Sequence, residues 1–356
     1  MKTIQVQLGQ RSYPIHIKSG LFKDFPDLLM ETNHGQKWII ISQHGLMELF
    51  GFELMAKLKE QSFNIDYISV PMGEAAKSMK EFNNVMSQLT EFECDRSTTV
   101  LALGGGVVGD LAGFAASTFM RGIEYFQIPT TLLAMVDSSI GGKTGINIAQ
   151  GKNMIGTFYQ PKGVLIDPDF LNTLHRNEVI AGLGEVVKYG AIWDADFLQE
   201  ISDWLDDIVS FPFEKAVKRS CKIKAEIISL DERENDLRRL LNFGHTIGHA
   251  LESYLGYGRI RHGEAIALGM QCSGWISERL NMLSKEDADY LNITINKLPL
   301  PKIKNIQGNN LMSFIKMDKK SEKGILNFVV LKGLGKAAIS IDVSEKMLQQ
   351  SLKVLH

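Results

Sequence analysis

The stretch from Thr98 to Asn153 constrains the fold more than any other part of the chain, because it joins an apolar run to a glycine-rich turn. The run Thr98–Leu103 is typical of a strand that is buried on both faces. Three glycines follow in the pattern G-x-G-x-x-G: Gly104, Gly106 and Gly109. The small residues from Leu111 to Ser117 then favour a helix, whose N-terminal N–H groups would point at a phosphate. The same pattern also occurs as a turn without a ligand.

Polar residues in the same stretch favour the interpretation with a ligand. The acidic residue that a standard dinucleotide fold places about 20 positions after the glycines is missing, since that region reads IPTT. The stretch instead crowds polar groups among its glycines: Thr130, Thr131, Asp137, Lys143, Lys152 and Asn153. Lysines beside glycines can meet an anion where the backbone also comes close to it.

Composition narrows the class of protein. The chain has 356 residues, which is enough for two domains, and a net charge of −2, which argues against a nucleic-acid partner. The three cysteines show no paired spacing and favour a reducing compartment: Cys94, Cys221 and Cys272. Residues 1–17 alternate apolar and polar side chains, unlike a signal peptide, and no apolar run approaches the roughly 20 residues of a membrane span. We therefore expect a cytoplasmic protein with no membrane partner.

The predicted secondary structure changes along the chain, from alternating strands and helices to mainly helices. Strands are expected at 2–8, 13–17, 37–42, 64–70, 98–103, 123–128 and 164–167, with helices between them at about 43–60 and 77–93. This alternation predicts an α/β domain with a parallel sheet over residues 1–170. A mainly helical domain is expected over residues 171–356. Its predicted helices are 176–206, 213–230, 239–255, 262–281, 285–296 and 344–352, with a hairpin at 325–330 and 337–341.

Three of the eight histidines lie within 18 residues and suggest a metal site. His245 and His249 are four positions apart, so a helix would place both on one face, and His262 begins the next predicted helix. Glu185 lies in another predicted helix, with Lys188 three residues later. Two histidines and one carboxylate leave an open position on Zn²⁺. The spacing also suits core or capping histidines, and the second histidine of the pair could hold substrate or relay a proton.

Basic residues recur in apolar or glycine-rich surroundings: Arg121, Lys143, Lys152, Lys188, Lys224, Arg238, Lys319 and Lys320. Any one of them could be an ordinary surface cation. Together with Asn153 and Asn242, they favour a pocket for an oxygen-rich anion that carries phosphate and carboxylate groups.

Six segments together resemble the 3-dehydroquinate synthases of the shikimate pathway, in family order over nearly the whole chain. They are GGGVVGDLAGF, IPTTLLAMVDSSIGGKTGIN, GKNMIGTFYQP, GEVVKYG, LLNFGHTIGHALE and RHGEAIALGM. The resemblance implies an N-terminal Rossmann-like NAD-binding α/β domain and an all-α C-terminal domain that binds metal and substrate. The implied cofactors are NAD and one divalent metal, Zn²⁺ or Co²⁺.

The resemblance also implies a lyase reaction. The substrate would be 3-deoxy-D-arabino-heptulosonate 7-phosphate, and the products 3-dehydroquinate and phosphate. Transient oxidation with NAD, phosphate elimination, reduction, ring opening and aldol cyclisation would follow one another in a single turnover. The partner is therefore a small sugar phosphate, and a homodimer is the assembly considered.

Site residues carry over by position. The metal ligands would be Glu185, His245 and His262. NAD would contact Met72, Gly73, Glu74, Ala75, Ala76, Lys77, Gly105, Gly106, Val107, Val108, Gly109, Asp110, Thr130, Thr131, Asp137, Lys143, Lys152, Phe170, Leu171, Asn172 and Thr173. Substrate and catalysis would involve Arg121, Lys143, Lys152, Asn153, Lys188, Lys224, Arg238, Asn242, His249 and, of the last lysine pair, Lys319. One departure is Gln43, where many relatives carry an aspartate for the adenosine ribose.

Three alternatives remain at this point. A metal-dependent polyol dehydrogenase would use NAD and a metal but would not need so many phosphate-binding lysines. Another sugar-phosphate cyclase differs only in its substrate. A non-enzymatic metal- or nucleotide-binding protein would have no reason to combine an open metal site with a polar NAD site.

Overall fold

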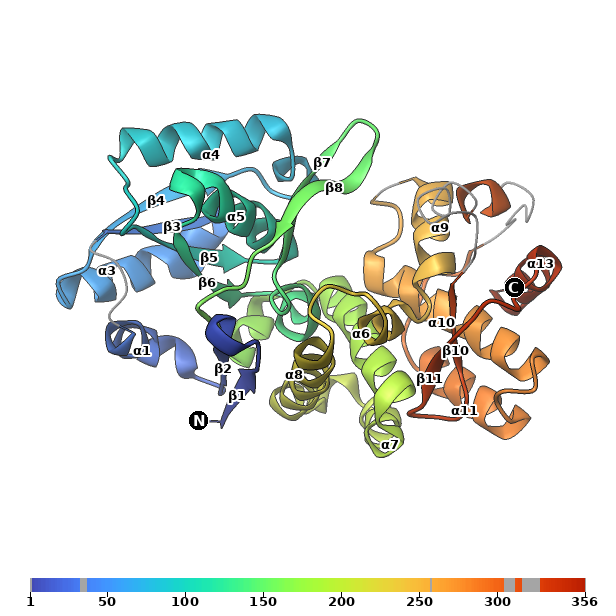
Figure 1. The fold of residues 1–356 in the computed structure, drawn as a ribbon. Helices are drawn as coiled ribbons and strands as arrows, with labels where there is room; N and C mark the ends of the chain where they lie inside the picture. Colours follow the sequence, from blue (N-terminus) through green and yellow to red (C-terminus); the bar gives the residue numbers. More distant parts are fainter. Residues whose placement is uncertain (1, 33–36, 257, 304–310, 316–326, 356) are drawn as a thin grey trace. The chain divides into compact units, whose positions relative to one another are not determined.

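The structure is a computed structural model that describes residues 2–32, 37–256, 258–303, 311–315 and 327–355. The chain divides into two compact units (Figure 1). The first consists of Met1–Leu174 and Lys224–Glu232, and the second of His175–Ile223 and Arg233–His356. The predicted fold class is confirmed, because the N-terminal part is α/β and the C-terminal part is mainly helical.

The first unit contains a seven-stranded sheet with the order β1-β2-β9-β6-β5-β3-β4. Its strands are β1 (Lys2–Val6), β2 (Tyr13–Ile17), β3 (Lys37–Gln43), β4 (Asn64–Val70), β5 (Thr99–Gly104), β6 (Glu124–Pro129) and β9 (Gly163–Ile166). Only β1 and β2 pair antiparallel; every other pairing in the sheet is parallel. All residues of β5 are buried, as its continuous apolar run predicts for a central strand.

Helices cover both faces of this sheet. They are α1 (Phe25–Glu31), α2 (His44–Leu46), α3 (Phe52–Glu60), α4 (Met79–Glu91) and α5 (Gly106–Thr118). Figure 1 shows α4 and α5 on one side of the sheet and α1 and α3 on the other. Alternate residues of β3 and β5, among them Ile41 and Ala102, share one apolar core with Leu89 of α4 and Leu111 of α5. Because β3, β4, β5 and β6 run parallel, the loops that follow them lie at one edge of the sheet.

The sheet has a topological switch point at β3. Strand β4 lies on one side of β3 and β5 on the other, with Ser42 of β3 beside Leu103 of β5. In open α/β sheets such a switch point leaves a crevice at the carboxyl ends of the strands, where ligands bind. The turns after β4, β5 and β6 all begin at this edge. They carry the segments 72–77, 105–110 and 130–131, which contain most of the predicted NAD residues.

A two-stranded hairpin, β7 (Lys143–Ile148) and β8 (Gly151–Phe158), was not predicted from the sequence. It has no apolar alternation, since glycines and polar residues dominate both strands. Glycine is required where the strands pair closely: a Cβ atom at Gly156 would lie 2.0 Å from the carbonyl oxygen of Thr144. The hairpin therefore depends on backbone pairing between its two strands, which carry Lys143, Lys152 and Asn153.

In its described residues, the second unit consists of helices and a small hairpin. Its elements are α6 (Arg176–Trp193), α7 (Ala195–Trp204), α8 (Phe213–Leu230), α9 (His245–Leu255), α10 (His262–Arg279), α11 (Lys285–Asn296), β10 (Phe328–Leu331), β11 (Ala337–Ser340) and α13 (Glu345–Ser351). The final part of α8, from Lys224 onward, belongs to the first unit. Among the helices in the described ranges, none combines the length and the hydropathy needed to cross a bilayer.

Two predicted helix boundaries were wrong. The helix expected over 176–206 is two helices, because the Asp194 side chain accepts a hydrogen bond from the N–H of Phe197 (3.1 Å) and starts α7. The helix expected over 239–255 begins only at His245. A short 3₁₀ turn (Leu237–Asn242) and Gly244, with a φ of 80°, precede it. His245 and His262 consequently each occupy the first position of a helix.

Candidate active site

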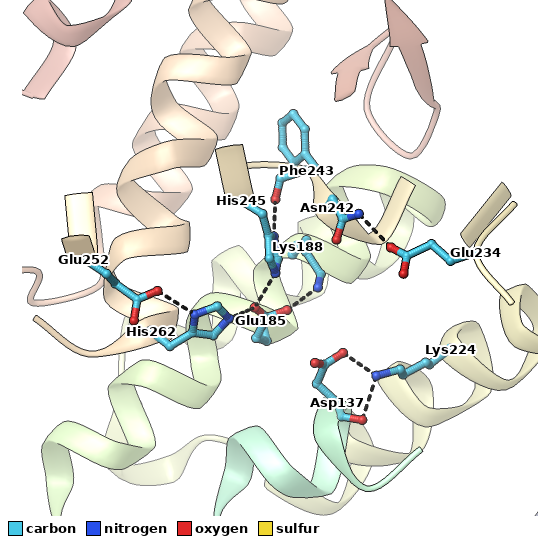
Figure 2. Close-up of polar contacts among 10 residues, drawn as sticks. All are labelled: Asp137, Glu185, Lys188, Lys224, Glu234, Asn242, Phe243, His245, Glu252 and His262. Carbon is cyan, nitrogen blue, oxygen red and sulfur yellow. Dashed lines mark hydrogen bonds and ion pairs between the residues drawn. The ribbon is translucent and has the colours of Figure 1, made fainter. Parts of the chain in front are cut away.

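The three proposed metal ligands come together in the second unit, from three different helices (Figure 2). Glu185 lies on α6 and is 0% exposed, and its Oε1 atom is 3.7 Å from Nε2 of His245 and 3.6 Å from Nε2 of His262. The ligating atoms of His245, His249 and His262 all lie within 4.8 Å of one another. Sequence spacing places the first two histidines together, but only the fold brings Glu185, 60 positions earlier, to the same point.

Hydrogen bonds on the far side of each ring orient two of these histidines. Nδ1 of His245 lies 3.2 Å from the carbonyl oxygen of Phe243, and Nδ1 of His262 lies 3.0 Å from Oε2 of Glu252. A carbonyl or a carboxylate only accepts hydrogen bonds, so each Nδ1 donates and each Nε2 keeps its lone pair. Both lone pairs are then available beside Glu185, which is the arrangement that metal-binding histidines adopt.

The charge on Glu185 is compensated inside the protein. Lys188, which is 1% exposed and one turn further along α6, pairs with Oε2 of Glu185. Oε1 of Glu185 is buried and accepts no hydrogen bond from the residues that the structure describes. Because a buried carboxylate oxygen needs a partner, this atom is suited to bind a cation.

His245 is suited to the neutral state that a metal ligand needs. Burial lowers the pKa of His245 well below its ordinary value, and the nearby charge of Lys188 adds to this effect. The imidazole is therefore neutral throughout the physiological pH range, with its lone pair free to bind a metal.

Glycines allow the ligand-bearing helices to touch along their backbones. Gly184 precedes Glu185, and Gly263 follows His262, so both lie beside a proposed ligand. A Cβ atom at Gly263 would lie 1.7 Å from the carbonyl oxygen of Ala181, and one at Gly184 would lie 2.2 Å from that of Gly263. The distance between the ligands of α6 and α10 is thus set by direct contact of the two main chains.

We expect the substitution Gly263→Ala to destabilise the protein by at least about 1–3 kcal/mol, because a backbone carbonyl cannot move away as a side chain can. Urea unfolding measures this change. Gly274→Ala on the same helix is the matched control, since its Cβ atom would meet only the end of the Leu291 side chain, at 3.1 Å. The control should be close to neutral. A Gly263→Ala protein as stable as the control would contradict the close contact.

The glycine turn after β5 packs closely against the segment 131–138. Gly105 caps α5, and the helix begins at Gly106, so its first N–H groups face the carboxyl edge of the sheet. A Cβ atom at Gly105 would lie 3.1 Å from Thr131, and one at Gly106 would lie 2.7 Å from the Ser138 hydroxyl. A side chain at Gly106 would displace Ser138, and one at Gly105 would press against Thr131, so glycine favours the close approach of the 131–138 segment.

A buried lysine joins the turn after β4 to the glycine turn and to the β7–β8 hairpin. The ammonium of Lys77 lies 2.5 Å from Oδ2 of Asp110 and 2.5 Å from Oδ1 of Asn153. Glu74 accepts a hydrogen bond from Asn147 (2.7 Å), whose Oδ1 accepts one from the N–H of Asn153 (2.8 Å). Burial raises the pKa of Asp110, and the charge of Lys77 opposes this shift. Three residues predicted for NAD, Glu74, Lys77 and Asp110, and one predicted for substrate, Asn153, therefore form a single network.

Other predicted residues of the first unit occupy varied environments. Lys224 donates to Oδ1 (2.6 Å) and to the carbonyl oxygen (2.7 Å) of Asp137, so these two predicted residues meet (Figure 2). Arg121 is exposed and has a φ of 70°, directly after Met120 with a φ of 49°. Such left-handed backbone is unfavourable for residues other than glycine and often accompanies functional sites. The Phe170 ring packs against Phe22, Phe25 and Phe50, so its side chain belongs to the core.

The remaining predicted residues lie in the second unit or outside the described part. Arg238 is 1% exposed, and Asn242 donates to Oε1 of Glu234 (2.8 Å). His249 is exposed, in contrast to its two partners. Lys319 and Lys320 lie outside the described residues.

Sequence reasoning missed two carboxylates at this site, Glu234 and Glu252. Glu252 lies seven residues after His245 and therefore on the same face of α9, which was the available signal. Glu234 lies in the polar stretch 231–236, which connects α8 to the 3₁₀ turn Leu237–Asn242. Its hydrogen bond to Asn242 shows that this connection reaches a predicted site residue.

Comparison with solved structures relates this geometry to known enzymes. The chain matches 2-deoxy-scyllo-inosose synthase, solved with carbaglucose-6-phosphate, NAD⁺ and Co²⁺, with a TM-score of 0.89 at 25% identity over 99% of both chains. It also matches 2-epi-5-epi-valiolone synthase from Streptomyces hygroscopicus subsp. jinggangensis 5008, solved with NAD⁺ and Zn²⁺. That TM-score is 0.87 at 27% identity, over 98% of both chains.

Comparison of sequences is more specific. The family models for the N-terminal and C-terminal parts of 3-dehydroquinate synthase match residues 67–181 and 182–321. The 3-dehydroquinate synthase of Thermoanaerobacter pseudethanolicus is 40% identical over 353 residues, which cover 98% of this chain and 99% of that relative. The chain therefore belongs to the 3-dehydroquinate synthase family.

Proposed function

We propose that the protein converts 3-deoxy-D-arabino-heptulosonate 7-phosphate to 3-dehydroquinate and phosphate. The observation that carries this proposal is the buried Oε1 atom of Glu185, which faces the Nε2 atoms of His245 and His262. Full-length similarity to 3-dehydroquinate synthases supports the choice of reaction. The protein is thus a lyase that uses NAD and one divalent metal.

The donor set fits Zn²⁺ or Co²⁺, because it combines one carboxylate and two neutral imidazoles and leaves a position open. We assign Glu185, His245 and His262 as the ligands. A bound metal supplies Lewis-acid polarisation of substrate oxygens. Lys188 pairs with the Glu185 carboxylate and orients it. Exposed His249 stands beside the two histidine ligands, where it can hold a substrate hydroxyl or relay its proton.

The carboxyl edge of the sheet fits NAD. The first N–H groups of α5, behind Gly105, can hold the pyrophosphate. Gln43 ends β3, the strand that pairs with β5, and we propose that it contacts the adenosine ribose. NAD supplies reversible removal of hydride from a substrate hydroxyl. Glu74, Lys77, Asp110, Thr130, Thr131 and Asp137 complete the proposed contacts. For Phe170–Thr173 we propose contacts through the backbone and the exposed residues, since the Phe170 ring is packed in the core.

Basic residues would hold the two anionic ends of the substrate. We assign Arg121, Lys143, Lys152, Lys224, Arg238 and Lys319 to this role, with Asn153 and Asn242 as hydrogen-bond donors. Charge-assisted hydrogen bonds to phosphate and carboxylate are the strong ones, so several fixed cations can retain the substrate while its ring opens and closes. We also propose that residues 1–170 form the NAD-binding domain and residues 171–356 the domain for metal and substrate.

Identification of the product tests the proposed function directly. The purified protein, with NAD and Co²⁺, should release phosphate from the heptulosonate phosphate and form 3-dehydroquinate, identified by mass spectrometry and NMR. Turnover of glucose 6-phosphate or sedoheptulose 7-phosphate, without turnover of the heptulosonate, would instead make the protein a different sugar-phosphate cyclase.

We expect no net NADH to accumulate during turnover, because the hydride that the substrate gives up returns to it in the same cycle. The measurement is NADH absorbance recorded alongside phosphate release. As a control, the same protein is incubated with NAD⁺ and glycerol under the same conditions, and no NADH should form. Build-up of NADH in step with product would support a polyol dehydrogenase.

The proposal extends to the setting of the protein. Its partner is a small sugar phosphate, and we place the enzyme in the cytoplasm, where its three buried cysteine thiols would remain reduced. A homodimer is the assembly that we propose. Light scattering coupled to gel filtration would test it by giving the mass of the particle in solution.

A further inference from the structure

The carboxylate of Glu252 is buried at the metal site without being one of the proposed ligands. Its side chain is 10% exposed, and its Oε2 atom lies 3.0 Å from Nδ1 of His262 (Figure 2). An ionised carboxylate is costly to bury, so its retention here needs a compensating interaction. The hydrogen bond from the His262 ring is such an interaction.

Helix α9 places Glu252 at this point. His245, at the start of α9, and Glu252, seven residues later, lie on the same helix face, two turns apart. The helix thus supplies one proposed metal ligand directly and also supports a second one, His262, which belongs to α10. The support for the first ligand is different, because Nδ1 of His245 donates to the backbone carbonyl of Phe243.

We propose that Glu252 is a positioning residue, which holds the His262 ring so that Nε2 faces the metal. By accepting a hydrogen bond from Nδ1–H, Glu252 fixes the tautomer that has a lone pair on Nε2. The same hydrogen bond makes Nε2 a better electron-pair donor to a cation. It also opposes rotation of the ring about its Cβ–Cγ bond, because a half turn would put carbon atoms where Nδ1 now faces Glu252 and Nε2 faces Glu185. This inference rests on the proposed metal site and adds a residue that acts through His262.

The experiment measures binding of Co²⁺ to the protein after chelator treatment, by competition with a chromophoric chelator and by the visible spectrum of bound Co²⁺. Glu252→Ala should raise the Kd by about 10–100-fold, the usual effect of losing a carboxylate behind a ligating histidine. Glu252→Gln keeps an accepting oxygen of the same shape, so its Kd should lie between those of the wild type and the alanine variant. A shifted Co²⁺ spectrum in both variants would report the altered ligand, which a purely structural role would leave unchanged.

Glu178→Gln is the matched control. Glu178 on α6 accepts a hydrogen bond from Arg261, the residue directly before His262, at 2.7 Å, but it contacts none of the proposed ligands. Removing this charge tests whether any weakened contact at the start of α10 reduces metal affinity. The control should bind Co²⁺ with the wild-type Kd and spectrum.

The outcomes separate this inference from the proposed function. Wild-type protein that binds no Co²⁺ would overturn the metal site itself. If the wild type binds Co²⁺, a folded Glu252→Ala protein with unchanged Kd and spectrum overturns the role of Glu252. Should the alanine variant fail to fold, as judged by circular dichroism, Glu252→Gln decides: a raised Kd supports the role, and a wild-type Kd and spectrum overturn it.

Discussion

Replacement of His262 by alanine is expected to abolish stoichiometric binding of Zn²⁺ or Co²⁺ and to lower kcat/KM by about 10³-fold or more. The size follows from the several kcal/mol of transition-state stabilisation that a bound metal supplies. The variant removes the only proposed ligand on α10 and leaves Glu185 with one imidazole beside it. Elemental analysis of the purified protein gives the metal content, and phosphate release gives the rate.

His44→Ala is the control for the loss of a histidine as such. His44 is exposed on the first unit and pairs only weakly with Glu48, at 3.4 Å. Its replacement should leave both metal content and rate unchanged. If His262→Ala retained one metal per chain, the ligand assignment would be wrong. The ion would then have to be held without His262, by residues such as Glu185, His245 and His249.

Lys152→Met is expected to lower kcat/KM by about 30-fold to several thousand-fold. Methionine keeps the length of the side chain but removes the ammonium, so a buried substrate anion would lose one charge-assisted contact, worth roughly 2–5 kcal/mol. Lys152 lies on β8 of the hairpin, next to Asn153 of the Lys77 network. Steady-state kinetics measure the loss, and metal content should not change, because Lys152 is no ligand.

The control here is Lys162→Met in the same unit. Lys162 is about half exposed and pairs with Glu124 at 3.0 Å, an interaction that contributes little at a protein surface. Both lysine variants should unfold at nearly the wild-type temperature. A Lys152→Met enzyme with near wild-type kcat/KM would indicate that Lys152 makes no important contact with substrate. It would also weaken the assignment of the other basic residues.

Local sequence patterns predicted most of the sheet and several helices. The run Asn64–Val70 was predicted to the residue, and Lys37–Gln43 within one residue. Lys37–Gln43 has the continuous apolar core of a buried strand, whereas Asn64–Val70, at the edge of the sheet, mixes apolar and polar residues. The hairpin of β7 and β8 was missed for the opposite reason. Its strands pair through their backbones at Gly145 and Gly156, and no pattern of side chains reports that pairing.

The site was predictable only in part. The spacing of His245 and His249 places both on one helix face, but nothing in the spacing brings Glu185 to them, and its assignment came from the family resemblance. The sequence placed His245 inside a longer helix. In the structure Gly244 starts a new helix there, so the Phe243 carbonyl is free of helical hydrogen bonding and can orient the ring. Such contacts depend on helix ends, which local patterns locate poorly.

Lys77 would couple the binding of the nucleotide to the binding of the sugar phosphate. Its one ammonium contacts Asp110, on the proposed nucleotide side, and Asn153, on the proposed substrate side. A ligand that draws either residue away from Lys77 changes the free energy of the other contact. Linkage then requires reciprocity: whatever factor the nucleotide imposes on the affinity for sugar phosphate, the sugar phosphate must impose on the affinity for nucleotide. The strength of this coupling would thus depend on a single buried ammonium group.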